Sequence, residues 1–201
     1  MGHLLGHDRV LIRFVALYCM GLVLLFLSWT AAYYLLPEGM LREVGLPGAL
    51  AGESAAGSLG EEFSRILLLN LFAFTVIVAG NYILRVKYFS FGYLVPLAWM
   101  IMYAITLGTN SFTISLGEPL APSLAVFMRS GPYEMMAATL LAVATDNISA
   151  NYSDNFFSSS NPVPADRRAP MTRERWIAVA TSLAILALAV FREAYLIMGL
   201  G

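Results

Sequence analysis

The chain has 201 residues, of which 59% are hydrophobic and 12% are charged, and its mean hydropathy is +0.71. Soluble domains carry about 25% charged residues, so this composition predicts a surface that faces lipid. The formal net charge of −1 gives no electrostatic basis for binding nucleic acid, which we do not expect as a partner. The single cysteine, Cys19, excludes an internal disulfide framework and a metal site built on several cysteines.

The first long apolar segment runs over residues 14–36 without a charge. At about 1.5 Å of helix per residue it is long enough to cross a bilayer. A signal peptide is the alternative interpretation. The run is longer than the usual hydrophobic region of about 7–15 residues, and no small-x-small cleavage site closes it, so we expect a retained span.

Four further apolar segments follow, and together they predict an all-α, polytopic integral membrane helix bundle that forms a single transmembrane domain. The uncharged run from 88 to 117 is too long for one straight crossing, so we expect its helix to end near residue 110. At 112–130 we expect a short helix, or a re-entrant or interfacial segment. The expected spans are 14–36, 66–84, 88–110, 132–151 and 175–197, with loops at 37–62 and 151–173.

The start of the fourth span is ambiguous. Gly131-Pro132 is typical of a helix start, which places the span at about 132–151. The alternative begins near Ser123 and buries Arg129 and Glu134 within the helix.

The basic residues predict the orientation in the cell membrane. With five spans and a cytoplasmic N-terminus, eight of the 12 Lys and Arg residues lie inside and four lie outside. By the positive-inside bias this favours a C-terminus outside the cell. The eight residues expected inside are Arg9, Arg13, Arg85, Lys87, Arg167, Arg168, Arg173 and Arg175.

Asn70 and Asn81 lie in the second expected span, about three helical turns apart. Together with Phe74 and Ile77 they share one face of that helix. Amides inside a bilayer usually bond a neighbouring helix, which stabilises the pair by about 0.6–2 kcal/mol. We expect this structural role first, with a substrate or ion path as the alternative.

Glu134 falls in the first turn of the fourth span, where the helix dipole favours a carboxylate. If the helix begins deeper in the bilayer, an ionisable group there is usually functional. Arg129, five residues earlier, is a candidate partner for it.

Asp146 and Asn147 lie near the other end of that helix, and Asp146 points about 120° away from Glu134. The two carboxylates therefore do not form one site, and a proton or cation relay would need a ligand from another helix. A polar helix end near the cytoplasmic face is the simpler expectation.

Enzymatic function is not indicated. The only histidines, His3 and His7, precede the first span, so a buried histidine base or a two-histidine metal site is not expected. We expect no cofactor either, although apolar grooves that bind lipids or pigments leave no motif.

A short set of motifs between residues 62 and 152 points to a known family. Asn70 lies in the second helix, and Gly131-Pro132-Tyr133-Glu134 matches the Gly-x-x-Glu part of a His-Gly-x-x-Glu motif that opens the next span. Ser130 replaces the motif histidine, and the small-residue and arginine pattern that usually follows is replaced by Ala144-Thr145-Asp146-Asn147. In these features the chain resembles the stage II sporulation protein M family.

The resemblance implies an all-helical membrane protein without catalytic chemistry, similar to a scaffold that works with other envelope proteins. We therefore expect a non-enzymatic membrane subunit or scaffold, in contact with lipids and with another membrane protein or further copies of itself. The alternative is a small oligomeric transporter or channel-like permease with a polar path around Glu134, Asn70 and Asn81.

Overall fold

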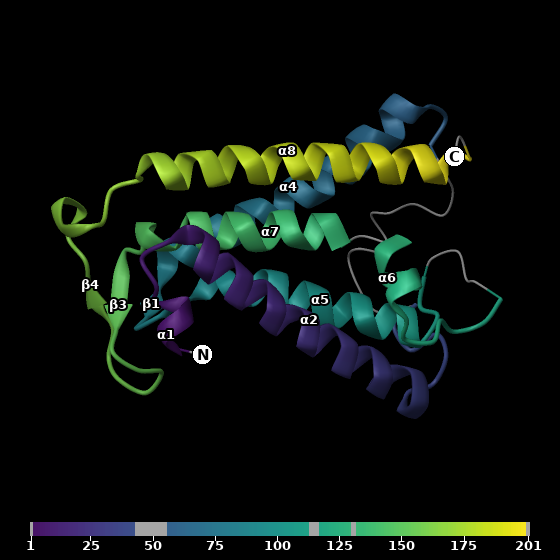
Figure 1. Ribbon diagram of the computed structural model, residues 1–201, viewed down its shortest axis with the longest axis horizontal. Coiled ribbons are helices and arrows are strands. Elements are labelled where there is room, and N and C mark those ends of the chain that lie inside the picture. The colour runs from purple at the N-terminus through teal and green to yellow at the C-terminus, as the bar shows by residue number, and fades with distance from the viewer. Residues whose placement is uncertain (1, 43–55, 113–116, 130–131, 200–201) are drawn as a thin grey trace.

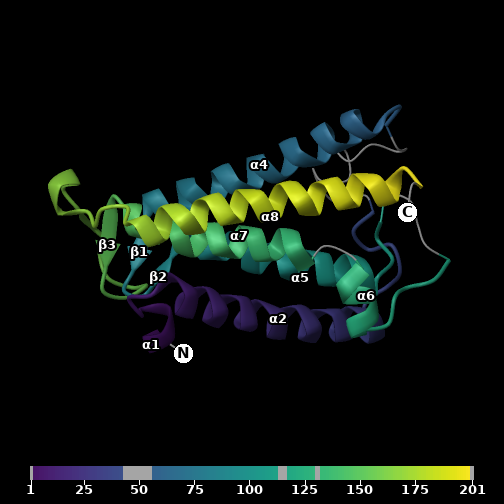
Figure 2. The ribbon, with the colours of Figure 1, turned by 45° about the horizontal axis from the view of Figure 1, so that its top comes forward.

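The computed structural model describes residues 2–42, 56–112, 117–129 and 132–199. These residues form a bundle of long helices with a small sheet at one end, and the N- and C-termini lie at opposite ends of the bundle (Figure 1). The turned view in Figure 2 shows the same arrangement, with the strands gathered where α2 begins.

Four helical segments of the described residues are long and apolar enough to cross a membrane. The expectation of a helical, multi-pass membrane protein agrees with this finding, but the expected number of five spans does not. The four segments are α2 (Val10–Leu35), α4 (Leu59–Ile83), the stretch Phe91–Gly108 that ends in α5 (Leu94–Gly108), and α8 (Arg173–Ile197). A shorter helix, α7 (Pro132–Ala144), runs beside them and packs mainly against α8 and α4.

The helix boundaries differ from the expected spans at four places. In the expected span 88–110, residues 89–90 form a strand and 91–93 a 3₁₀ turn, so helix α5 begins only at Leu94. Helix α4 begins seven residues before the expected position 66, because the Ser58 side chain accepts a hydrogen bond from the amide of Glu61 and caps the first turn. Helix α2 also begins earlier than expected and includes Arg13, whose side chain is buried. The expected span 132–151 is too long, because α7 ends at Ala144 and a 3₁₀ turn, η2 (Asp146–Ile148), follows it.

The segment expected at 112–130 contains a short helix, α6 (Leu124–Arg129), which is separate from α7. Residues 113–116 and 130–131 lie outside the described part, as does the side chain of Arg129. The remaining short elements are the helix α1 (Gly2–Leu5) and the 3₁₀ turns η1 (Phe91–Tyr93) and η3 (Ala165–Arg167).

The all-α expectation is wrong in one respect, because the chain also contains a four-stranded sheet in the order β2-β1-β3-β4. Lys87 and Tyr88 form a two-residue turn that pairs β1 with β2, and the segment expected as a loop at 151–173 returns to pair β3 parallel to β1. Strands this short leave no alternating pattern in the sequence. The strands are β1 (Arg85–Val86), β2 (Phe89–Ser90), β3 (Asn151–Ser153) and β4 (Asn161–Pro162).

Two glycines allow α4 to lie close to the segment that leads into α5. A Cβ atom on Gly92 would lie 2.3 Å from Oδ1 of Asn81 and 2.4 Å from the carbonyl oxygen of Ile77, and a Cβ atom on Gly80 would lie 3.0 Å from the amide nitrogen of Gly92. Small residues at such crossings let helix backbones approach, which is a main source of association in membranes.

Gly92→Ala is expected to destabilise the protein by about 1–3 kcal/mol, because the added methyl group cannot fit without moving α4. The measurement is the thermal unfolding midpoint of the purified protein in mild detergent. Gly60→Ala is the matched control, since nothing lies within 4 Å of its added Cβ atom. Equal midpoints for the two variants would show that the contact at Gly92 has little effect on stability.

Candidate functional site

The carboxylate of Asp146 is the centre of a buried ionic cluster just after α7, with only 1% of the residue exposed. Its Oδ2 accepts hydrogen bonds from Nη1 of Arg13 at 2.5 Å and from the hydroxyl of Tyr93 at 2.7 Å. Its Oδ1 accepts one from Nη1 of Arg175 at 2.7 Å. Both oxygens are therefore bound by donors from α2, η1 and α8.

Arg175 also closes the C-terminal end of α7. Its Nη1 lies 2.9 Å from the carbonyl oxygen of Ala144, 3.3 Å from that of Val143 and 3.0 Å from Oδ1 of Asn147. The last carbonyl groups of a helix have no partner within it, and the helix dipole favours a cation there. Arg175 thus neutralises Asp146 and the end of α7 together.

The cluster carries two arginines for one carboxylate. In the described part of the chain, Nε and Nη2 of Arg13 are buried without a hydrogen-bond partner. A buried charge that loses its counter-charge costs several kcal/mol, so the ion pairs with Asp146 are needed to keep Arg13 inside the bundle.

Two neighbouring side chains connect the cluster to the rest of this end of the bundle. Nδ2 of Asn147 donates to the carbonyl oxygens of Ala169 at 2.7 Å and Pro170 at 3.1 Å. Oε1 of Glu174 accepts a hydrogen bond from the amide of Val10 at 2.9 Å, which satisfies a free N–H group in the first turn of α2.

Asn81 joins the end of α4 to the end of α7, which is the structural role expected first. Its Nδ2 donates to the carbonyl oxygen of Ala142 and to Oγ1 of Thr145, both at 2.7 Å. Asn70, Phe74, Ile77 and Asn81 are all buried on one face of α4, so the predicted shared face is confirmed.

Asn70 and Glu134 form a separate polar site nearer the other end of the bundle. The Glu134 carboxyl group interacts with the side chain of Asn70 on α4 and with the carboxyl group of Glu193 on α8. Within the described residues, Oε1 of Glu134 and Oδ1 of Asn70 are buried without a hydrogen-bond partner.

The five candidate residues whose side chains are described divide between two places. Asn81, Asp146 and Asn147 belong to the end with the sheet, and Asn70 and Glu134 lie together elsewhere. Of the three residues expected around a polar path, Asn70 and Glu134 interact with each other, whereas Asn81 bonds Ala142 and Thr145 at the end of α7. The proposed partnership of Arg129 with Glu134 falls outside the described side chains.

The partners of Asp146 were not predicted from the sequence. Arg13 was expected at the membrane boundary, although the apolar residues at 10–12 before it already indicated that the helix begins earlier. Tyr93 and Arg175 gave no comparable signal, because 53 and 29 residues separate them from Asp146.

Among the described residues no group of three or more His, Cys, Asp or Glu side chains could hold a metal ion. Comparison of the chain with known proteins found no matching family model, no matching curated protein and no matching solved structure. The resemblance to the stage II sporulation protein M family therefore stays a prediction.

Asp146→Asn is expected to destabilise the protein by about 3–5 kcal/mol, because the buried Arg13 and the partly buried Arg175 lose their counter-charge. The change is measured as the loss of folded, monodisperse protein on heating in mild detergent. Asp154→Asn removes an exposed carboxylate from the same end of the chain and serves as the control. A similar small loss in both variants would contradict the importance of the cluster.

Proposed function

We propose that this chain is a non-enzymatic integral membrane subunit or scaffold that binds other membrane or envelope proteins. The observation that carries the proposal is an ordered loop between β3 and β4 that presents two phenylalanines. The saturated state of Asp146 supports it too, because a carboxylate bound by two arginines and a tyrosine has little capacity left for a substrate.

The loop is held by its own polar groups. Oγ of Ser153 donates to the carbonyl oxygen of Asn155 at 2.7 Å, and Oδ1 of Asn155 accepts from the amide of Phe157 at 2.9 Å. These bonds fix the backbone in a turn that Asn and Ser commonly form. The ring of Phe156 lies 6.1 Å from that of Phe89, whereas Phe157 is 100% exposed.

An exposed aromatic ring in a fixed loop is suited to binding a protein. Moving a phenylalanine ring from water into contact with a partner is favourable, because it removes apolar surface from water. Aromatic anchors at the centre of an interface supply much of its affinity, and a preformed loop reduces the entropy lost on binding. The family resemblance supports the same class of function.

A photo-crosslinking amino acid at position 157 is expected to capture a discrete protein in native membranes, detected by mass spectrometry. The matched control is the same label at Phe72, which is 69% exposed on α4 within an apolar stretch. Phe157→Ser should lose the co-purifying partner while its unfolding free energy changes by less than about 0.5 kcal/mol. The absence of protein adducts at 157, or identical adducts at both positions, would contradict the proposal.

A second candidate function, an oligomeric permease, is favoured by the unsatisfied acceptors of Asn70 and Glu134 beside Glu193. Ionisable groups inside a helix bundle can exchange a proton or hold a cation, and they usually mark a transport path.

If this second candidate holds, Glu134→Gln abolishes proton flux into proteoliposomes that contain a pH-sensitive dye, without changing the amount of folded protein. Glu118→Gln, which alters an exposed carboxylate, should retain full flux. Unchanged flux in the Glu134 variant would exclude Glu134 as the transport site.

A further inference from the structure

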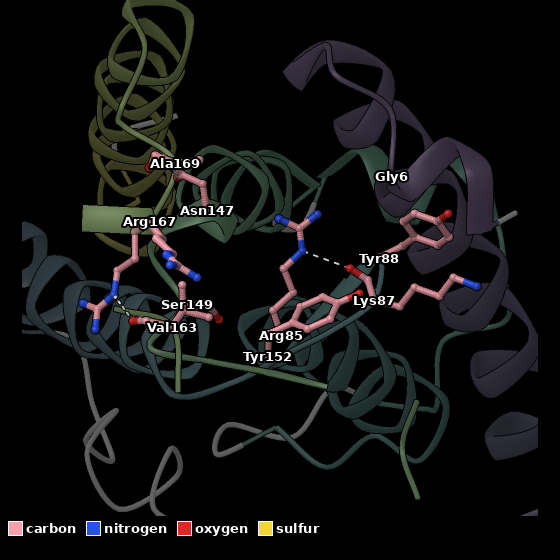
Figure 3. A pocket seen from close by; sticks show the side chains of 11 residues that line it. Gly6, Arg85, Lys87, Tyr88, Asn147, Ser149, Tyr152, Val163, Arg167 and Ala169 are labelled. Atoms are coloured by element: carbon pink, nitrogen blue, oxygen red, sulfur yellow. Dashed lines mark hydrogen bonds between the residues drawn. The ribbon is translucent and has the colours of Figure 1, made fainter. Parts of the chain in front are cut away.

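A cavity of about 380 Å³ opens at the end of the bundle that carries the sheet. It lies between the β1–β2 hairpin, the start of β3 and the segment that follows η3, and Gly6 lines it from the N-terminal side (Figure 3). Its volume falls within the range of about 300–1,000 Å³ that is common for small-molecule sites. It is separate from the ionic cluster, although Asn147 borders both.

The lining of this cavity, which we call the basic cavity, contains four cations and no acidic residue. Figure 3 shows Arg85 and Lys87 on one side and Arg167 on the other, and the fourth cation is Arg168. In the described part of the chain, no ion pair joins any of the four to a carboxylate. The cavity thus concentrates positive charge without an internal counter-charge.

Backbone groups and aromatic rings hold three of these cations in place. Nε of Arg85 donates to the carbonyl oxygen of Lys87 at 3.0 Å, and Nε of Arg168 donates to that of Val163 at 3.2 Å. The ammonium group of Lys87 lies 5.2 Å from the centre of the Tyr88 ring. Each contact fixes the side chain and leaves its positive charge unneutralised.

The backbone at Lys87 is also unusual. Its φ angle is +50°, in the left-handed region that glycine adopts most easily. Its amide donates to the carbonyl oxygen of Ser153 at 2.8 Å, which ties the hairpin to β3. A lysine in a position that suits glycine puts a cation at the rim of the cavity at the expense of backbone strain.

Two tyrosines, Tyr88 and Tyr152, also line the cavity. Partial burial and the neighbouring Asp154 carboxylate raise the pKa of the Tyr152 phenol above its usual value, and the phenol hydrogen-bonds that carboxylate. Tyr152 is therefore engaged with Asp154 and does not count among the groups that would bind an anion.

We propose that the basic cavity binds a phosphate group, carried either by an anionic lipid headgroup or by a small soluble molecule. Guanidinium groups match the geometry of phosphate oxygens and form paired, charge-assisted hydrogen bonds with them. The cavity lies at the end where the expected cytoplasmic cations gather, so an anionic lipid of that leaflet would reach it directly.

Two probes distinguish the two phosphate sources. Inorganic pyrophosphate, titrated by calorimetry into the full-length protein in an uncharged detergent, tests a soluble ligand. Dioleoyl phosphatidic acid in mixed micelles, read out by native mass spectrometry, tests a headgroup, with dioleoylglycerol as the control that lacks the phosphate. Binding of either probe at one site per chain supports the proposal and identifies the source, whereas binding of neither overturns it.

Variants locate the site. Arg85→Gln and Arg167→Gln are each expected to weaken binding about tenfold or more, because each removes a charge-assisted contact. Arg173→Gln, an equal charge change at the same end but outside the lining, should alter affinity less than about twofold. An equal effect of Arg173→Gln would overturn the proposal, because it would show that only the general positive charge matters.

Lys87→Gly separates binding from folding. Glycine relieves the backbone strain at φ +50° and removes the ammonium group, so the thermal midpoint should stay equal or rise while phosphate affinity falls. If a stable Lys87→Gly protein keeps its phosphate affinity, Lys87 is excluded from the site. If the Arg85 and Arg167 variants also keep their phosphate affinity, the proposal is overturned.

Discussion

The burial of one carboxylate, Asp146, is the constraint on which the arrangement of this bundle depends. Two arginines and a tyrosine from three other segments surround it, and the residue is only 1% exposed. In a low-dielectric interior a charge is tolerated only with such partners, so α2, α8 and the segment before α5 must meet where α7 ends. The helices are therefore fixed at this end by charge as well as by apolar contact.

The position of the basic cavity follows from the same constraint. Asn147 accepts a hydrogen bond from Arg175 and donates to the carbonyl oxygens of Ala169 and Pro170, so the ionic cluster also fixes the segment that carries Arg167 and Arg168. The parallel pairing of β3 with β1 then brings Arg85 to the other side. A ligand of the basic cavity would therefore rest on a rigid support, which favours selective binding.

Both ends of the bundle contain buried polar atoms without a hydrogen-bond partner among the described residues, but their charged groups differ. Near the sheet, Asn81 and Asp146 bond across helices, and the carboxylate of Asp146 is paired with two arginines. Around Glu134, buried acceptors on α4 and α7 have no partner among the described residues, and two carboxyl groups lie close together. An ionisable group inside the bundle, such as Glu134, is a candidate for a functional role. A scaffold would use the end with the sheet, where the loop between β3 and β4 presents Phe157, whereas a permease would use the site around Glu134.

The sequence by itself determined the class of protein, because apolar length and low charge are local properties that decide whether a segment can cross a bilayer. It also determined the shared face of Asn70 and Asn81, since helical periodicity fixes direction over a few turns. Only the tertiary structure decided which groups neutralise Asp146, since Arg13 is separated from it by 133 residues. It also decided that strands of two or three residues pair at one end of the bundle. Such contacts depend on how the helices pack against one another, and a local pattern of residue types does not predict that packing.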